Sequence, residues 1–417
     1  MASEAPRSDL HRSPDAIEDL ATDIDALDHL LTSIRRHLHQ RPEVGMQEHD
    51  THRFIRSTLE RYGFEVQGPV AKTGLYVDIE GRAPGPTVGY RADIDALPAT
   101  DAKRVSYKSQ RDQAAHLCGH DAHTAVGIGV ALLLRHHQDE FSGTARVFFQ
   151  PNEEGLPSGA PLMIRDGVID GLDAVYCIHV DPRLETGQFG LISGPATAAS
   201  DRFDVVVKYE ATGHSARPHE TVDTVWVATD IMNSLYQLSG RVTDARNSTV
   251  LTVCRFQAGE AYNVIPDQVI FGGTLRTTSP HDRAYLRQQM ERTAKQLATA
   301  YGAQASLEME HGAPPVMNDP DLIQHVERVI QAHFGDEAIH YIQQPSMGGE
   351  DFAHYLEHIP GALIRVGTSS NPATSYPLHD VRFDIDESVL APTAHLMARS
   401  LIGHLETPTL HSNSSTT

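Results

Sequence analysis

The sequence contains no apolar run that approaches the ~18 residues needed by a membrane-spanning helix. Residues 1–20 also lack the basic and then apolar segments of a signal peptide. Cysteine is scarce: the 3 cysteines cannot all pair, and a chain of 417 residues can bury a core without a disulfide scaffold. We therefore expect a soluble, cytoplasmic protein with no membrane partner.

Lysine is rare as well, with 5 in the whole chain. Lysine and arginine total 34 against 55 acidic residues, which gives a formal net charge of −21 at pH 7. Such a surface repels phosphate backbones, so no nucleic acid partner is expected. The acidic excess also means that an anionic substrate would need local basic side chains or bound cations.

Helical and strand patterns alternate in the first half of the chain. Apolar spacing predicts helices over 23–38, 51–62, 124–136 and 160–166. Short apolar runs predict strands over 74–79, 87–90, 145–150 and 174–180. This alternation predicts an α/β fold with a mixed, largely parallel sheet.

The pattern changes near residue 200. Strands are predicted over 203–209, 248–257 and 268–277, with helices over 222–238 and 282–301. An α+β domain at 199–311 would therefore interrupt a larger α/β domain made of 1–198 and 312–417. The α/β pattern returns with helices over 320–334, 351–356 and 388–404 and a strand over 362–366, and the polar tail from Glu406 is expected to fray.

Side chains able to bind metal gather where predicted strands end. Asp93, the adjacent Glu153 and Glu154, and His179 occupy such ends, and ligands collect at the carboxyl ends of strands in open α/β sheets. Residues 116–123 add five further candidate ligands, which are His116, Cys118, His120, Asp121 and His123. His379 lies in a late loop.

So many donors at one sheet edge would need cations to neutralise them. Imidazole, thiolate and carboxylate together favour zinc, manganese or cobalt over calcium or magnesium. Of two adjacent glutamates, one can bind metal while the other faces a substrate and moves the proton that hydrolysis requires. The alternative is a pair of solvated acids on a loop. Cys177 and Cys254 are expected to be buried thiols.

Eight ordered motifs between residues 30 and 400 carry a family resemblance. They are Arg36-His-Leu-His-Gln-Arg-Pro-Glu43, Arg91-Ala-Asp-Ile-Asp-Ala-Leu-Pro98, Cys118-Gly-His-Asp-Ala-His-Thr124, Phe149-Gln-Pro-Asn-Glu-Glu-Gly155, Gly213-His-Ser-Ala-Arg-Pro-His219, Asn263-Val-Ile-Pro-Asp267, Met347-Gly-Gly-Glu-Asp-Phe352 and Pro377-Leu-His379. Together they resemble the amidohydrolase branch of the aminoacylase-type dinuclear metallopeptidases, which includes hippurate and auxin-conjugate hydrolases.

The resemblance implies a catalytic α/β domain interrupted by a smaller α+β lid through which the chain forms a homodimer. It implies that two divalent cations, Mn²⁺ or Zn²⁺ with Co²⁺ as a third option, bind Cys118, His120, Glu154, His179 and His379. Cys118 would bridge the two ions as a thiolate. Glu153 would be the general base, and Asp93 would support the metal ligands. Arg91 stands where the wider clan has a histidine, and Cys118 where it has an aspartate, which favours the amidohydrolase branch.

Three residues of the lid are further candidates. His214 would donate a hydrogen bond to the oxyanion of the tetrahedral intermediate, or else is a surface histidine beside a turn. Asn263 and Arg276 would bind the carboxylate or carbonyl of the substrate, or else donate structural hydrogen bonds.

The expected activity is metal-dependent hydrolysis of an N-acyl-amino acid to a carboxylic acid and an amino acid. A dipeptidase or aminopeptidase of the same clan, and an inactive homologue that binds metal or ligand, are the alternatives. One departure from the family pattern is Asn152, which stands where many relatives have alanine and is expected to be a conservative change on a loop.

Overall fold

The computed structural model describes residues 16–407, so most of the predicted frayed tail lies outside the described residues. The chain divides into two compact units. Unit 1 comprises Met1–Gly194, Met317–Gln343 and His354–Thr417, and unit 2 comprises Pro195–Val316 and Gln344–Ala353. The predicted insertion at 199–311 lies within unit 2, and no sequence pattern indicated that Gln344–Ala353 also belongs there.

Unit 1 is built on an eight-stranded mixed sheet in the order β1-β2-β4-β3-β5-β16-β6-β15. Its strands are β1 (Gln67–Val70), β2 (Gly74–Glu80), β3 (Thr87–Asp93), β4 (Thr144–Gln150), β5 (Ala174–Glu185), β6 (Phe189–Leu191), β15 (Ile339–Tyr341) and β16 (Gly361–Ser369). The central strands β4, β3, β5 and β16 are mutually parallel, and the pairs β1–β2, β2–β4 and β6–β16 are antiparallel. The predicted α/β fold with a largely parallel sheet is confirmed.

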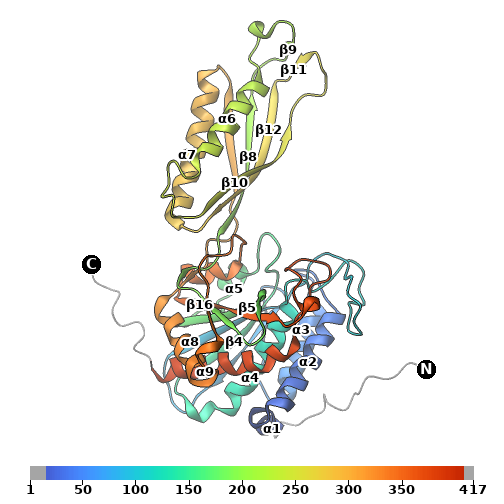
Figure 1. Ribbon diagram of the computed structural model, residues 1–417, viewed down its shortest axis with the longest axis vertical. Helices are drawn as coiled ribbons and strands as arrows, with labels where there is room; N and C mark the ends of the chain where they lie inside the picture. The colour runs from blue at the N-terminus through green and yellow to red at the C-terminus, as the bar shows by residue number, and fades with distance from the viewer. Residues whose placement is uncertain (1–15, 408–417) are drawn as a thin grey trace, which may run out of the picture. The chain divides into compact units, whose positions relative to one another are not determined.

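The helices of unit 1 supply most of its apolar core. They are α1 (Ala16–Thr22), α2 (Ile24–Gln40), α3 (His49–Arg61), α4 (His120–His136), α5 (Ala160–Arg165), α8 (Pro320–His333) and α9 (Leu390–Glu406). Helix α2 begins where the Asp23 carboxylate accepts the amide N–H groups of Asp25 and Ala26, and it buries one stripe of leucine and isoleucine. Helix α4 packs against α2, α9 and strand β3. Figure 1 shows α4 beside α2 and α9. None of the described helices combines the length and apolar character needed to cross a membrane.

Unit 2 is a four-stranded antiparallel sheet with two helices packed against it (Figure 1). Its main elements are β8 (Ala199–Lys208), β9 (Gly213–His214), α6 (Thr224–Leu238), β10 (Thr249–Gln257), β11 (Val264–Ile265), β12 (Gln268–Thr277), α7 (Pro280–Ala300) and β13 (Gln304–Glu310). The sheet order is β10-β12-β8-β13, and β9 pairs with β11 separately. Apolar residues of α6, α7 and the sheet form a second core.

Short elements complete the chain. The two-residue strands β7 (Gly194–Pro195) and β14 (Met317–Asn318) lie in the sequence where the chain passes between the units. The 3-10 helices are η1 (Gln138–Glu140), η2 (Pro218–Glu220), η3 (Asp336–Ala338), η4 (Asp351–Glu357), η5 (Pro372–Thr374) and η6 (Glu387–Val389).

Several predicted elements were wrong in extent or type. Helix α4 begins at His120 rather than near residue 124, so His120 and His123 lie in its first turns. Strand β5 continues past His179 to Glu185, because β16 pairs with it as far as Ser369. The predicted helix at 351–356 is the 3-10 helix η4. Cys177 is buried as predicted, but Cys254 is exposed because it lies on the edge strand β10.

A buried ion-pair network joins distant segments of unit 1. Arg35 of α2 is 1% exposed, and its guanidinium donates to Asp121 (2.8 Å), Asp384 (2.6 Å) and Glu387 (3.0 Å). His39 adds a contact from Nδ1 to the same Asp121 carboxylate at 2.6 Å. Asp121 directly follows His120, so this network holds the first turn of α4, where candidate metal ligands begin.

Replacing Arg35 by methionine is expected to lower the free energy of unfolding by about 3–5 kcal/mol, because buried carboxylates lose their partner. Arg36 is the matched control: it also binds Glu387, at 2.5 Å, but its side chain is 46% exposed. Arg36→Met should lower the free energy of unfolding by less than about 1 kcal/mol. Urea unfolding at pH 7 measures both values, and equal losses would contradict the importance of the buried network.

The network also predicts acid sensitivity. Burial alone would raise the pKa of Asp101, but contacts with His39 and the amides of Ser109 and Lys103 lower that pKa well below its usual value. The carboxylate therefore stabilises the folded state above the unfolded-state pKa, and this stability is lost as pH falls through the lower folded-state pKa. Asp101→Asn should reduce stability at pH 7 and flatten its decline between pH 5 and pH 2. Chemical denaturation across that range tests this, and an unchanged slope would contradict it.

Candidate metal centre

The candidate ligands converge because the parallel strands β3 and β4 end at the level of His179 on the neighbouring, longer strand β5. Strand β3 pairs with β4 so that Asp93 lies opposite Gln150, and Glu153 and Glu154 follow that residue by three and four positions. Strand β3 also pairs with β5 through Arg91 and Cys177. Two residues further along, these strands carry Asp93 and His179, so both side chains reach the same level of the sheet.

The turn into α4 brings Cys118 and His120 to this edge. Gly119 caps the helix with φ +87°, and a Cβ atom there would lie 2.3 Å from Cγ2 of Val180 on β5. Only glycine allows both the left-handed backbone and this close approach. The backbone N–H of His379, which has φ +69°, donates to the carbonyl of Leu117 at 2.8 Å and so joins the late loop to the same turn.

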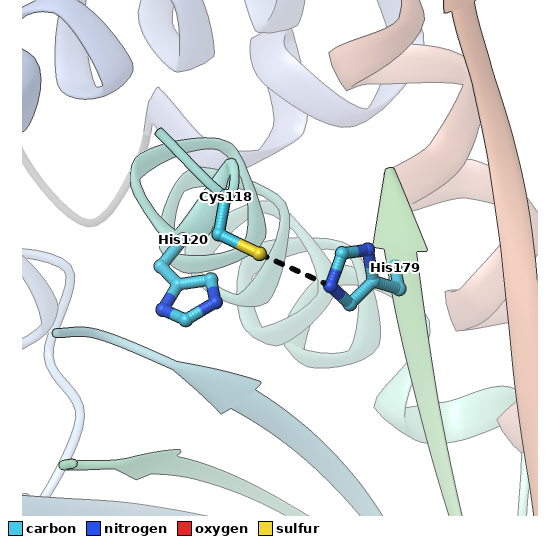
Figure 2. Close-up of side chains that lie close together, drawn as sticks. All are labelled: Cys118, His120 and His179. Carbon is cyan, nitrogen blue, oxygen red and sulfur yellow. Dashed lines mark hydrogen bonds between the residues drawn. The ribbon is translucent and has the colours of Figure 1, made fainter. Parts of the chain in front are cut away.

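The five predicted metal ligands fall into overlapping groups. Cys118 forms one group with His120 and His179, and a second with Glu154 and His379. Within each group the candidate donor atoms lie within 4.8 Å of one another. Sγ of Cys118 is 3.5 Å from Nε2 of His179. Figure 2 shows the Cys118 side chain pointing from the start of α4 toward His179 on β5. Cys118 is therefore common to two sets of donors.

A third group connects His120 with Glu153 and Glu154. Oε1 of Glu154 is 3.1 Å from Nε2 of His379, and this contact raises the pKa of His379 above its usual value. The adjacent glutamates thus both lie at the cluster, rather than in solvent on an isolated loop, and both are only partly exposed.

Hydrogen bonds orient two of the imidazoles as metal ligands. Nδ1 of His179 donates to the carbonyl of Val180 at 2.8 Å, and Nδ1 of His120 donates to Asp95, 3.0 Å from its carbonyl and 3.1 Å from Oδ1. Each arrangement leaves the Nε2 lone pair facing the cluster, as in carboxylate–histidine–metal sites. Nε2 of His120 is buried with no hydrogen-bond partner in the described part of the chain.

The electrostatics of the cluster fit a bound cation. Burial, and next the charge of Glu154, raise the pKa of the Cys118 thiol well above its usual value. Burial, and next the Arg365 guanidinium, lower the pKa of His179, which keeps that imidazole neutral and able to bind metal. A divalent cation would stabilise the thiolate and fill the coordination left open at Nε2 of His120, so these donors fit a metal site.

Asp93 lies beside the predicted ligands. Its Oδ1 accepts from Nδ1 of His123 at 2.6 Å, its Oδ2 accepts from Arg91 at 2.7 Å, and Oδ2 is 3.7 Å from Nε2 of His120. Nε2 of His123 in turn accepts the N–H of Val180 at 3.1 Å. Both nitrogens of His123 are therefore used within the protein, which leaves no lone pair for a metal.

Sequence reasoning missed Asp95. Besides orienting His120, its Oδ2 accepts the backbone N–H of Glu154 at 3.1 Å. The available signal was its place two residues after Asp93 in the same motif. His116, also a sequence candidate, stays outside the groups: it is buried, which lowers its pKa to about 3, and both ring nitrogens lack a hydrogen-bond partner in the described chain.

The remaining predicted residues belong to unit 2. His214 on β9 lies opposite Val264 on β11, and Ser215 donates to the carbonyl of Asn263 at 3.1 Å, so His214 and Asn263 are neighbours. Both are exposed. Arg276 on β12 donates to the carbonyl of Met347 at 3.4 Å, and burial, and next Arg202, lower its guanidinium pKa.

Comparisons with known proteins agree with this arrangement. Residues 89–402 match the model of peptidase family M20/M25/M40. N-acetyl-L-cysteine deacetylase of Bacillus subtilis is 36% identical over 90% of this chain and 88% of its own length. Thermostable carboxypeptidase 2 of Saccharolobus solfataricus is 33% identical over 90% of this chain and 95% of its own.

A solved structure gives the same result. A dinuclear metal-binding M20 peptidase from Bacillus subtilis superposes with a TM-score of 0.82 at 34% identity, covering 92% of this chain and 99% of that chain. These matches and the eight motifs show that the chain belongs to peptidase family M20/M25/M40, in its amidohydrolase branch, and that it is a hydrolase.

Proposed function

We propose that this enzyme hydrolyses the amide bond of N-acyl-amino acids and releases a carboxylic acid and an amino acid. Two divalent cations, Zn²⁺, Mn²⁺ or Co²⁺, would bind Cys118, His120, Glu154, His179 and His379. The observation that carries this proposal is the position of Cys118 in two donor groups, because a single sulfur bound to two ions accounts for both. The deacetylase relative supports the substrate class.

Glu153 is the proposed general base. When bound, the two cations would lower the pKa of water and polarise the carbonyl of the amide. The Glu153 carboxylate would accept the proton of the attacking water and donate it to the leaving nitrogen. Asp95 would keep His120 in place during the reaction through its hydrogen bond to Nδ1, and Asp93 would support the ligands from its position beside them, where Arg91 and His123 hold it.

Unit 2 would act as the lid and as the dimerisation domain. His214 would donate a hydrogen bond to the oxyanion, and its neighbour Asn263 and the half-buried Arg276 would bind the carboxylate or carbonyl of the substrate. The exposure of His214 and Asn263 in unit 2 supports a role in contacting a ligand rather than in packing.

The relation to a carboxypeptidase favours one second candidate, an exopeptidase that cleaves unblocked peptides at the same metal centre. A panel of N-acetyl-, N-benzoyl- and N-indoleacetyl-amino acids and free dipeptides, each assayed with Mn²⁺, Zn²⁺ or Co²⁺, separates the two activities. Faster turnover of the blocked amino acids supports the proposal, and faster turnover of the dipeptides favours the exopeptidase.

Removing the proposed bridging sulfur should reduce metal binding. Cys118→Ala is expected to retain fewer than two ions per chain after dialysis, because both donor groups lose the ligand that they share. Cys177→Ala is the control, since Cys177 is also buried but lies outside the candidate groups. Elemental analysis measures the stoichiometry, and two ions per chain in Cys118→Ala would rule out the bridge.

The two glutamates should respond differently to neutralisation. Glu153→Gln is expected to keep both ions and lower kcat by about 10²–10⁴-fold, because proton transfer is lost. Glu154→Gln is expected to lose metal, because it removes a ligand charge. Steady-state kinetics with elemental analysis checks both variants, and wild-type kcat in Glu153→Gln would reject it as the base.

A further inference from the structure

We propose that Glu48 is a positioning residue for Glu153, and that it works with Asp95 to hold the turn on both sides of the proposed base. The inference rests on the proposed function for the role of Glu153, but its geometry stands on contacts that lie wholly within unit 1. Glu48 would touch neither metal nor substrate and would act through the backbone of the turn.

Glu48 is a fully buried carboxyl group whose two oxygens are both engaged. Oε1 accepts the backbone N–H of Asn152 at 3.0 Å, and Oε2 accepts the hydroxyl of Thr73 at 2.7 Å. Glu48 directly precedes helix α3, where a side chain commonly caps the helix, yet it makes no such bond. Glu43 accepts the N–H of Thr51 in the first turn of α3 instead, at 2.8 Å.

The two carboxylates hold backbone N–H groups on either side of Glu153. Glu48 binds the N–H of Asn152, the residue before it, and Asp95 binds the N–H of Glu154, the residue after it, at 3.1 Å. The peptide group before Asn152 and the peptide group after Glu153 are therefore both held by buried acceptors, which restricts the backbone of the turn that carries Glu153. The side chain of the proposed base is aimed by a turn that is held on both sides of it.

Asn152 suits the backbone of this turn, and its side chain takes part in the packing of the turn. It is 7% exposed and has φ +55°, a left-handed conformation that asparagine tolerates better than alanine does. Its side-chain amide donates to the carbonyl of Pro157 at 2.8 Å. Cβ atoms at Gly45 and Gly155 would lie 1.8 and 2.1 Å from its Oδ1, so these glycines make room for it.

The hydrogen bond from the backbone N–H of Asn152 to Glu48 does not depend on the charge of Glu48. Burial raises the pKa of Glu48 to about 7, while the Thr73 hydrogen bond opposes that rise. A protonated carboxyl group can still accept the Asn152 N–H and can donate its own proton to the Thr73 hydroxyl. A glutamine at position 48 can make the same two bonds, whereas methionine fills a similar volume with no comparable acceptor.

The test compares Glu48→Gln with Glu48→Met in the metal-loaded full chain. Glu48→Met is expected to lower kcat by about 100-fold, the loss that a displacement near 1 Å can cause, with KM within threefold of wild type and two ions retained. Glu48→Gln should keep kcat within threefold. Wild-type kcat in Glu48→Met, or equal losses in both variants, would overturn the proposal, as would loss of metal from Glu48→Met.

Glu43→Met controls for the cost of removing a buried carboxylate from the same loop. Glu43 is 7% exposed and also accepts a backbone N–H, but that N–H belongs to α3. We expect a lowered melting temperature with kcat within threefold of wild type, and a 100-fold loss there would overturn the proposal. If Glu48→Met does not fold, Glu48→Asp, which withdraws the acceptor by one methylene, takes its place with the same expected outcome.

A structural measurement separates this inference from the proposed activity. In crystals of the zinc-loaded proteins, the Glu153 carboxylate should move by about 1 Å or more in Glu48→Met and stay in place in Glu48→Gln. An unmoved carboxylate in Glu48→Met would overturn the positioning role. If wild-type enzyme cleaves no acyl-amino acid, the proposed function fails, while this comparison still decides the role of Glu48.

Discussion

The buried sulfur of Cys118 is the constraint on which the site depends. Its surroundings raise the pKa of the thiol, so a thiolate there requires positive charge nearby. The side chains close to Sγ are imidazoles and a carboxylate, and both belong among the usual ligands of transition metals. Two divalent cations would stabilise the thiolate, fill the open position at Nε2 of His120 and offset the adjacent acids. Without cations, this donor set would be a costly concentration of polar groups.

The sheet places these donors, and buried acidic residues then fix their orientation. Strands β3 and β4 end beside His179 of β5, which brings distant parts of the sequence together. Asp95 orients His120 and holds Glu154, while Asp121 ties the first turn of α4 to Arg35. The acidic residues of this unit therefore do more than give the surface its charge: several accept hydrogen bonds that define the position of a proposed ligand or base.

Much of this arrangement could be predicted from the sequence, because it depends on local patterns of apolar and polar residues. Apolar periodicity predicted α2, β10 and β12 closely. The predicted ends of the strands indicated which metal-binding side chains gather at one site. The start of α4 was missed because its first turn is polar, with His120 and Asp121 in place of apolar residues. Strand β13 was missed although Ala305, Leu307 and Met309 alternate with polar residues; these three are partly buried and pack against the apolar core of unit 2.

The supporting contacts were beyond prediction because they depend on tertiary approach. Nothing in the order of residues indicates that Glu48 reaches Asn152, more than a hundred positions away, or that Gly45 is small to admit the Asn152 side chain. The inclusion of Gln344–Ala353 in unit 2 has the same origin, since it follows from backbone bonds such as the one from Ser346 to Ala196. Spacing predicts which side chains share a face, but not which backbone groups they bind.

The proposed site requires that one sulfur binds two ions. The most direct test is a crystal structure of the zinc-loaded protein with anomalous diffraction recorded at the zinc edge. We expect two anomalous peaks per chain, each about 2.3 Å from Sγ of Cys118. A single peak, or two peaks with only one in contact with that sulfur, would contradict it.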